Sequence, residues 1–262
     1  MKIALRKTSL IDYPGRVSSV IFFPGCNLRC PWCHNGDLVL DNETGGLITL
    51  EDGLTLIRKR QPVLGGVVLS GGEPCLWEEL PDIIEEIKKF PLPVKVDTNG
   101  MFPAMLEKLL NREETRPAYI ALDLKIAPAR YGELTVPEKI INHRGTQSST
   151  EKSEKPITDS IKLLCGKEMG DMLVQSADLV RASGIAHEYR TLALPGSFIT
   201  ERDIEALAPL ADSAPWYFRP FRGGNCLDPA WNSLEERAGD SHVRLKVLAG
   251  RARELGKNAQ IP

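Results

Sequence analysis

The sequence contains no hydrophobic run long enough to span a bilayer, and its N-terminus, MKIALRKTSLIDYPG, lacks the apolar core of a signal peptide. It also has no surplus of basic residues, because 33 Lys and Arg stand against 35 Asp and Glu, for a formal net charge of −2. Nucleic-acid binding usually rests on a basic face, so this charge gives no reason to expect it. We therefore expect a cytoplasmic protein with neither a membrane nor nucleic acid as its partner.

Cysteine is also scarce, with six in 262 residues, and it is unevenly distributed. Three cysteines lie within eight residues and three are isolated: Cys26, Cys30 and Cys33, then Cys75, Cys165 and Cys226. In a cytoplasmic protein a tight cysteine group indicates a metal site before it indicates disulfides. The isolated cysteines have unmatched spacings, so we interpret Cys75 and Cys165 as packed side chains and predict no auxiliary iron–sulfur site.

Strand and helix patterns alternate along the chain, in a composition of 42% hydrophobic and 26% charged residues that is ordinary for a globular protein. We expect strands at 17–23, 66–70, 94–98, 118–124, 186–192 and 216–218, and helices at 50–60, 77–89, 102–111, 158–182, 201–210 and 234–255. Six βα-type units are too few for a closed eight-stranded barrel but suit an open one with parallel strands. The predicted fold is therefore α/β, a partial (β/α)6 TIM-like barrel in one domain over residues 1–262, with a mobile polar surface loop at 142–156.

The tight cysteine group, CNLRCPWC, has the spacing C-x3-C-x2-C and follows the first predicted strand. It supplies three thiolates, one fewer than a four-iron cluster needs, so one iron would be open to a substrate. The alternative is a structural zinc site with His34 as the fourth ligand. Such sites more often have two separated pairs of ligands, and no second pair follows here.

Polar residues follow three further predicted strands. Gly71, Gly72 and Glu73 come directly after the strand GVVLS, where two glycines would let a ligand approach the backbone and the Glu73 carboxylate could accept hydrogen bonds from an ammonium group. The alternative is a tight turn with a solvated Glu73. The other polar residues at strand ends are Asp97, Thr98 and Asn99, then Asp123 and Lys125. They should converge on the mouth that holds the cysteines, although Asn99 could equally be a turn residue and Lys125 a surface lysine.

The cysteine motif, with Trp32 before its last cysteine, and the later SGGEP resemble the radical S-adenosylmethionine (SAM) superfamily. The resemblance implies that Cys26, Cys30 and Cys33 ligate a [4Fe–4S] cluster and that the methionine end of SAM chelates its open iron. It also implies that the segment Gly71–Glu73 contacts the methionine amine. Trp32 is counted among the cofactor-binding residues.

Longer motifs resemble the glycyl-radical-enzyme activating proteins, most closely those for anaerobic ribonucleoside-triphosphate reductase. They are KTSLIDYPGRVSSVIFFPGCNLRCPWCHN, VDTNG, DLK, RYGELT, YRTLALPG and RPFRGGNCLD. The resemblance implies that Asp97, Thr98 and Asp123 line the SAM pocket, where two carboxylates could hold a monovalent cation. It also implies that Arg190 contacts SAM, with a structural ion pair as the alternative. Arg-Pro-Phe-Arg stands where formate-lyase activators often carry a histidine after the proline, which favours the reductase type.

The implied function is an oxidoreductase that takes an electron from flavodoxin or ferredoxin and cleaves SAM to methionine and a 5′-deoxyadenosyl radical. The radical would abstract hydrogen from a backbone glycine of a partner enzyme. A partial barrel leaves a lateral opening for a peptide loop, and Arg219 and Arg222 could belong to its docking surface or be solvated arginines. Two other functions stay open: a radical SAM enzyme that acts on a small molecule or another peptide, and a non-catalytic metal-binding regulatory protein.

Overall fold

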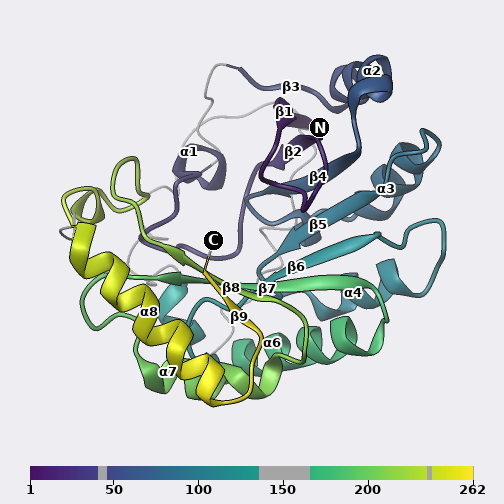
Figure 1. The fold of residues 1–262 in the computed structure, drawn as a ribbon. Helices are drawn as coiled ribbons and strands as arrows, with labels where there is room; N and C mark the ends of the chain where they lie inside the picture. The colour runs from purple at the N-terminus through teal and green to yellow at the C-terminus, as the bar shows by residue number, and fades with distance from the viewer. Residues whose placement is uncertain (41–45, 136–165, 235–237, 262) are drawn as a thin grey trace.

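The strands of the computed structural model form one sheet, in the order β3-β1-β2-β4-β5-β6-β7-β8-β9 (Figure 1). The structure describes residues 1–40, 46–135, 166–234 and 238–261. The strands are β1 (Lys2–Ser9), β2 (Ser18–Phe23), β3 (Ile48–Thr49), β4 (Gly66–Gly71), β5 (Val94–Thr98), β6 (Tyr119–Asp123), β7 (Ala186–Ala193), β8 (Trp216–Pro220) and β9 (Ala259–Gln260).

The centre of the sheet is parallel. Strands β2, β4, β5, β6, β7 and β8 are consecutive parallel neighbours, and the short β9 continues them beside β8. Strand β1 pairs antiparallel with β2, and β3 with β1. The six central strands confirm the predicted partial (β/α)6 barrel, while the single-domain organisation stays a prediction.

Helices connect these strands, and Figure 1 shows α4, α6, α7 and α8 along one side of the sheet. The helices are α1 (Gly36–Val39), α2 (Leu50–Arg60), α3 (Leu80–Lys88), α4 (Pro103–Leu110), α6 (Gly166–Ala182), α7 (Glu201–Leu207) and α8 (Ala238–Glu254). Short 3-10 turns are η1 (Gln61–Val63), η2 (Pro74–Leu76), η3 (Pro128–Leu134), η5 (Ala208–Leu210) and η6 (Pro229–Trp231). The Thr49 hydroxyl caps α2, because it accepts the backbone N–H of Asp52 at 3.0 Å.

Strand β5 shows how the sheet separates its apolar core from its site. Val94 and Val96 are buried in a cluster with Ile84 of α3. Successive side chains of a strand point to opposite faces, so Lys95 and Asp97 face the interior of the barrel. Both are nonetheless almost fully buried. The interior of the barrel is therefore charged, and the apolar core lies between the sheet and the helices.

Strand β8 repeats this division at the other end of the parallel strands. Trp216 and Phe218 are fully buried in a second cluster that includes Leu245 of α8. The alternate positions, Tyr217 and Arg219, are only partly buried and take the opposite face. Arg219 therefore points to the interior side of the sheet.

The prediction and the structure differ in three strands and at element boundaries. Strands β1, β3 and β9 were not predicted, because β3 and β9 are two residues long and KIALRKTS has no apolar alternation. Helix α3 begins at Leu80 instead of Trp77, since Trp77 follows η2 with an extended backbone. The predicted polar loop at 142–156, the first part of the helix at 158–182 and Cys165 lie outside the described residues.

Within the described ranges, none of the helices combines the length and apolar character that a membrane crossing requires.

Candidate functional site

The carboxyl ends of the parallel strands enclose a cavity of about 220 Å³, which we call the cysteine cavity. The structure brings all of the sequence-predicted site residues together on its wall. They are Cys26, Cys30, Trp32, Cys33, Gly71, Gly72, Glu73, Asp97, Thr98, Asn99, Asp123, Lys125 and Arg190. The parallel strands β2, β4, β5, β6 and β7 contribute residues at or just after their carboxyl ends, which is where parallel α/β barrels place their sites.

The cysteine loop, residues 26–33, is tied to distant parts of the chain. Its start is fixed by the Trp77 indole N–H, which donates to the carbonyl of Pro24 at 3.0 Å. Its end is fixed by the segment after β8, because the N–H of Leu227 donates to the carbonyl of Cys33 at 2.8 Å. The N–H of Asp228 also donates to the carbonyl of Pro31, at 3.0 Å. The loop is therefore held in place by the chain itself.

The three thiols suit iron–sulfur ligation better than a single metal ion. Among the residues that the structure describes, no three His, Cys, Asp or Glu side chains lie close enough to hold one ion. His34 is also engaged elsewhere, since its Nε2 is 2.8 Å from the carbonyl oxygen of Arg222. A four-iron cluster spreads its thiolate ligands around a cube, so three thiols around one cavity fit it. This geometry disfavours the zinc alternative.

Burial makes two of the cysteine thiols, those of Cys26 and Cys30, harder to deprotonate in the chain alone. Burial, and then the negative charge of Glu73, raise the pKa of Cys26 to about 12, and burial raises the pKa of Cys30 to about 11. Thiolates bind metal, so cationic iron must supply the attraction that deprotonates these groups.

Asn99 connects the end of β5 to the cysteine loop. Its Nδ2 donates to Asn27 Oδ1 at 2.9 Å and lies 3.7 Å from Cys26 Sγ. The backbone N–H of Leu28 donates to the same sulfur at 3.4 Å. Asn99 also forms the predicted turn, because its Oδ1 accepts the N–H of Met101 at 3.0 Å. It is thus both a turn residue and a contact of the cysteine loop.

The two glycines allow the end of β4 to pack against the backbone that leads into the cysteine loop. A Cβ on Gly72 would lie 1.8 Å from the carbonyl oxygen of Gly25, and one on Gly71, whose φ is +115°, would lie 2.4 Å from the nitrogen of Phe23. Two hydrogen bonds close this contact, from Gly72 N to Phe23 O at 2.8 Å and from Glu73 N to Gly25 O at 2.9 Å. The close approach seen here is therefore that of the chain's own backbone.

Glu73 is buried, with 1% of its surface exposed, so the solvated alternative is wrong. Its Oε1 accepts the N–H of Cys75 at 3.0 Å and the hydroxyl of Thr98 at 2.8 Å. Its Oε2 accepts the N–H of Asn99 at 2.7 Å. Burial raises the pKa of Glu73 to about 6 in spite of these bonds. The carboxylate joins the ends of β4 and β5 beside the cysteines.

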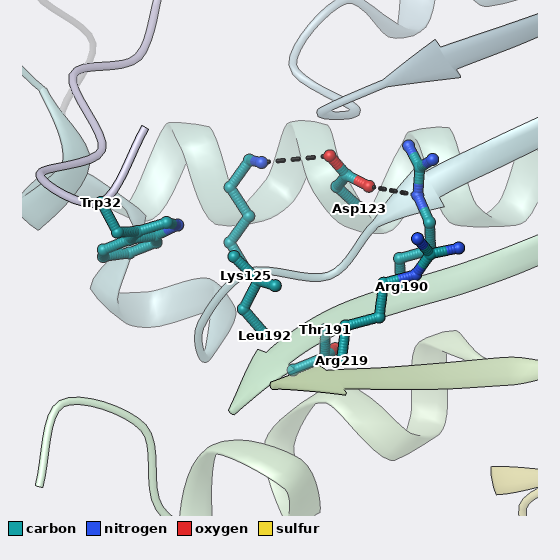
Figure 2. Close-up of a pocket in the computed structure, with 7 residues that line it drawn as sticks. All are labelled: Trp32, Asp123, Lys125, Arg190, Thr191, Leu192 and Arg219. Carbon is teal, nitrogen blue, oxygen red and sulfur yellow. Dashed lines mark hydrogen bonds and ion pairs between the residues drawn. The ribbon is translucent and has the colours of Figure 1, made fainter. Parts of the chain in front are cut away.

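Arg190 joins the ends of β5 and β6. Its Nη1 lies 3.1 Å from Asp97 and its Nε 2.8 Å from Asp123, and Lys125 lies 3.1 Å from Asp123 on the other side (Figure 2). Burial raises the pKa of Asp123, but the charges of Arg190 and Lys125 together outweigh it and lower the pKa to about 2. Arg190 therefore forms the ion pairs that the alternative interpretation expected. Lys125 lines the cysteine cavity and is not a surface lysine.

Two buried charges behind this group were not predicted. Lys95 pairs with Asp97 and lies 3.8 Å from Glu188, which accepts the hydroxyl of Tyr119 at 3.1 Å. Their sequence positions carried a signal, since Lys95 is two residues from Asp97, and Glu188 is two residues from Arg190. That spacing places each pair on one face of its strand.

The model of the radical SAM superfamily matches residues 20–211 of the chain. The chain belongs to the radical SAM superfamily. Members use a [4Fe–4S] cluster and S-adenosylmethionine, so the predicted cofactors are confirmed at the level of the family.

Two relatives are glycyl-radical enzyme activating enzymes. The chain is 30% identical over 228 residues to a putative glycyl-radical enzyme activating enzyme of Methanocaldococcus jannaschii, across 86% of this chain and 82% of the relative. It is 34% identical over 128 residues to the pyruvate formate-lyase-activating enzyme of Clostridium pasteurianum, across 47% of this chain and 51% of that protein.

Two solved structures share the fold. A radical SAM methyltransferase from Sphaerobacter thermophilus superposes with a TM-score of 0.59 at 15% identity, over 97% of this chain and 68% of that one. SuiB of Streptococcus suis bound to S-adenosylmethionine superposes with a TM-score of 0.57 at 12% identity, over 93% of this chain and 51% of that one. At these identities the likeness concerns the fold alone.

In this radical SAM protein the aromatic residue of the cysteine motif anchors the loop. Trp32 is buried, with ring centroids 5.0 Å from Phe198 and 5.4 Å from Trp231. Phe221 lies 5.8 Å from Trp231, and Arg130 lies over the ring of Phe198 at 5.5 Å. Trp32 therefore lines the cavity and also packs the loop against the segments that follow β7 and β8.

Six further residues line the cysteine cavity: His34, which was named only as the fourth ligand of the zinc alternative, and Leu28, Asn35, Val39, Ser70 and Leu192, which were not predicted. Most of them adjoin the cysteine motif or the glycines, and that proximity is the signal that could have identified them. Asn35 contributes a specific contact, because its Nδ2 donates to the carbonyl of Gly71 at 2.9 Å.

The isolated cysteines lie apart from this arrangement of ligands. Cys75 is buried beside Glu73, as its interpretation as a packed side chain predicts, and burial raises the pKa of its thiol. Cys226 is buried too, in the segment that contacts the cysteine loop. The absence of an auxiliary cluster at Cys75 and Cys226 stays a prediction. The monovalent cation beside Asp97 and Asp123 also stays a prediction. Arg190 and Lys125 already offset the charges of these two carboxylates.

Proposed function

We propose that this radical SAM protein activates a glycyl radical enzyme by removing a hydrogen atom from a backbone glycine of that partner. The observation that carries the proposal is the 30% identity, over 86% of the chain, to a putative glycyl-radical enzyme activating enzyme. The cysteine cavity supports it, because the residues that the chemistry needs share one wall.

Cys26, Cys30 and Cys33 would hold the cluster in this function. When bound, the cluster and SAM supply a one-electron cleavage that gives methionine and a 5′-deoxyadenosyl radical. The chain orients these groups and keeps water from the reacting atoms.

The polar wall of the cavity would hold SAM. Lys125 and Arg190 offer N–H donors suited to a carboxylate or to ribose oxygens, and Asp123 offers an acceptor suited to a hydroxyl. Glu73 uses three of the roughly four acceptor sites of its carboxylate within the chain, so one is left for the methionine ammonium. The Glu73 carboxylate also holds together the strand ends that form the wall of the cavity.

The finer proposal is that the partner is anaerobic ribonucleoside-triphosphate reductase, with flavodoxin or ferredoxin as electron donor. It is supported by the motifs RYGELT, YRTLALPG and RPFRGGNCLD, which resemble the activators of that reductase. The cytoplasm is the proposed compartment, because thiols stay reduced there.

The test is anaerobic mixing of reconstituted, reduced protein with SAM and each glycyl radical enzyme of the source genome, followed by electron paramagnetic resonance. We expect a doublet with the true partner that disappears when its target glycine becomes alanine. If SAM is cleaved while every candidate stays silent, the substrate is instead a small molecule or another peptide.

A further inference from the structure

A second cavity, of about 210 Å³, adjoins the cysteine cavity, and we call it the side cavity (Figure 2). The two cavities share Trp32, Asp123, Lys125, Arg190 and Leu192. A molecule in the side cavity would therefore lie next to whatever occupies the cysteine cavity.

The side cavity also contains Arg219, which does not line the cysteine cavity. In the register of the sheet Arg219 of β8 lies opposite Leu192 of β7, two positions beyond Arg190. Since β8 is the last of the six central strands, Arg219 lies toward the open side of the partial barrel. Of the two expectations for Arg219, part of a docking surface or a solvated arginine, the shielded Nε disfavours the solvated one.

Arg219 takes no part in the ion pairs of the barrel interior. Three carboxylates pair with three cations within 4 Å: Asp97, Asp123 and Glu188 with Lys95, Lys125 and Arg190. A fourth buried carboxylate, Glu73, accepts hydrogen bonds from neutral donors instead. Arg219 has no hydrogen bond or ion pair to any residue that the structure describes, and its Nε is shielded from water without a partner.

An unpartnered Nε is not by itself a site, and Arg60 shows why. The Nε of Arg60 is also buried without a partner. Its Nη2, however, donates to the Thr8 hydroxyl at 2.6 Å, and Arg60 lines neither cavity. In Arg219 three observations coincide: a shielded donor, a charge without a partner among the described residues and a cavity wall beside the site. A buried donor of this kind calls for an acceptor, which a ligand in the side cavity could bring.

We propose that Arg219 binds the protein substrate by donating to an oxygen of the peptide that flanks the target glycine. The acceptor is either a backbone carbonyl or the carboxylate of a neighbouring acidic residue. The proposed SAM contacts Lys125, Arg190 and Asp123 line both cavities, but Arg219 lies beyond them toward the open side of the barrel and does not line the cysteine cavity. The peptide of the partner would enter from that side, so it is the more suitable source of the acceptor. The side cavity is small, and Trp32 and Leu192 give it apolar walls, which suits a short stretch of peptide around a residue without a side chain.

This inference rests on the proposed function, and its test uses the full-length enzyme with the partner that gives the doublet. The variants are Arg219→Gln, which keeps a donor without the charge, and Arg219→Lys, which keeps the charge without the fork of donors. Arg60→Gln is the matched control. Iron content and thermal melting establish that each variant is folded and loaded. The partner concentration for half-maximal radical formation and the affinity for SAM are then measured separately.

We expect at least one Arg219 variant to raise the half-maximal partner concentration by about tenfold or more, since a charge-assisted hydrogen bond is lost. The affinity for SAM should stay within about twofold, and Arg60→Gln should match the wild type. A larger defect in Arg219→Gln indicates a carboxylate acceptor, and a larger defect in Arg219→Lys a carbonyl. Unchanged partner dependence in both variants overturns the inference, as does a defect confined to SAM affinity. A wild-type enzyme that is silent with every candidate refutes the proposed function instead, before any variant is compared.

Discussion

Replacing Gly72 with alanine should force the end of β4 away from the backbone that leads into the cysteine loop. The new Cβ would lie 1.8 Å from the carbonyl oxygen and 2.6 Å from the carbonyl carbon of Gly25. Both are backbone atoms, so no change of rotamer relieves the overlap. Separation would strain or break the hydrogen bonds from Gly72 N to Phe23 O and from Glu73 N to Gly25 O. Overpacking costs about 1–3 kcal/mol and each lost bond about 0.5–1.5 kcal/mol, so we expect a loss of about 2–6 kcal/mol.

The assay is urea unfolding of the apoprotein, together with iron and sulfide content after anaerobic reconstitution. Gly250→Ala is the matched control, because Gly250 lies in α8 with nothing within 4 Å of a new Cβ. Alanine is the better helix former, so this control should be neutral or up to about 1 kcal/mol more stable. The account would be refuted if Gly72→Ala unfolded at the wild-type urea concentration and took up a full complement of iron.

Three further predictions concern the cysteines, Glu73 and Asn99. Alanine at any one of the three loop cysteines should abolish cluster binding and SAM cleavage, whereas serine at Cys75 or Cys226 should leave iron content unchanged; loss of iron on changing Cys226 would contradict the assignment. Because the pKa of Glu73 is raised from 4.5 to about 6, its contribution to apoprotein stability is complete below pH 4.5 and is lost as pH rises through 6, a decline of about 2 kcal/mol. Urea titrations across this range should show that decline in the wild type but not in Glu73→Gln, and equal slopes would count against it. Asn99→Ala removes an N–H donor near Cys26 Sγ and should lower the midpoint potential of the cluster by on the order of 20–60 mV, measured by redox titration; an unchanged or higher value would contradict this.

Much of the fold could be predicted because the central strands are continuous apolar runs. GVVLS and AYIALDL are bounded by turns and helices, and their polar residues fall at the carboxyl end. Parallel strands bring those ends together, so the convergence of Glu73, Asp97 and Asp123 followed from topology alone. Strand β1 has no such signal, since KIALRKTS carries charges on both faces.

The partners of the site residues could not be predicted, because they depend on which strands are neighbours. That Arg190 bridges Asp97 and Asp123 requires the order β5-β6-β7, which local sequence does not specify. For the same reason the cavity that Arg219 lines was not predicted, although its alternation with Phe218 was visible in the strand. The three hydrogen bonds to Glu73 likewise depend on how the ends of β4 and β5 lie beside each other, which no motif specifies.

The central claim, that hydrogen is taken from a backbone glycine of a partner protein, is tested most directly by isotope transfer. The partner enzyme is produced with glycine deuterated at both α positions and mixed anaerobically with reduced, reconstituted protein and SAM, and the 5′-deoxyadenosine is examined by mass spectrometry. We predict 5′-deoxyadenosine that carries one deuterium, and loss of this label when the target glycine of the partner is replaced by alanine. Unlabelled 5′-deoxyadenosine, formed at the same rate with labelled partner, would contradict the claim.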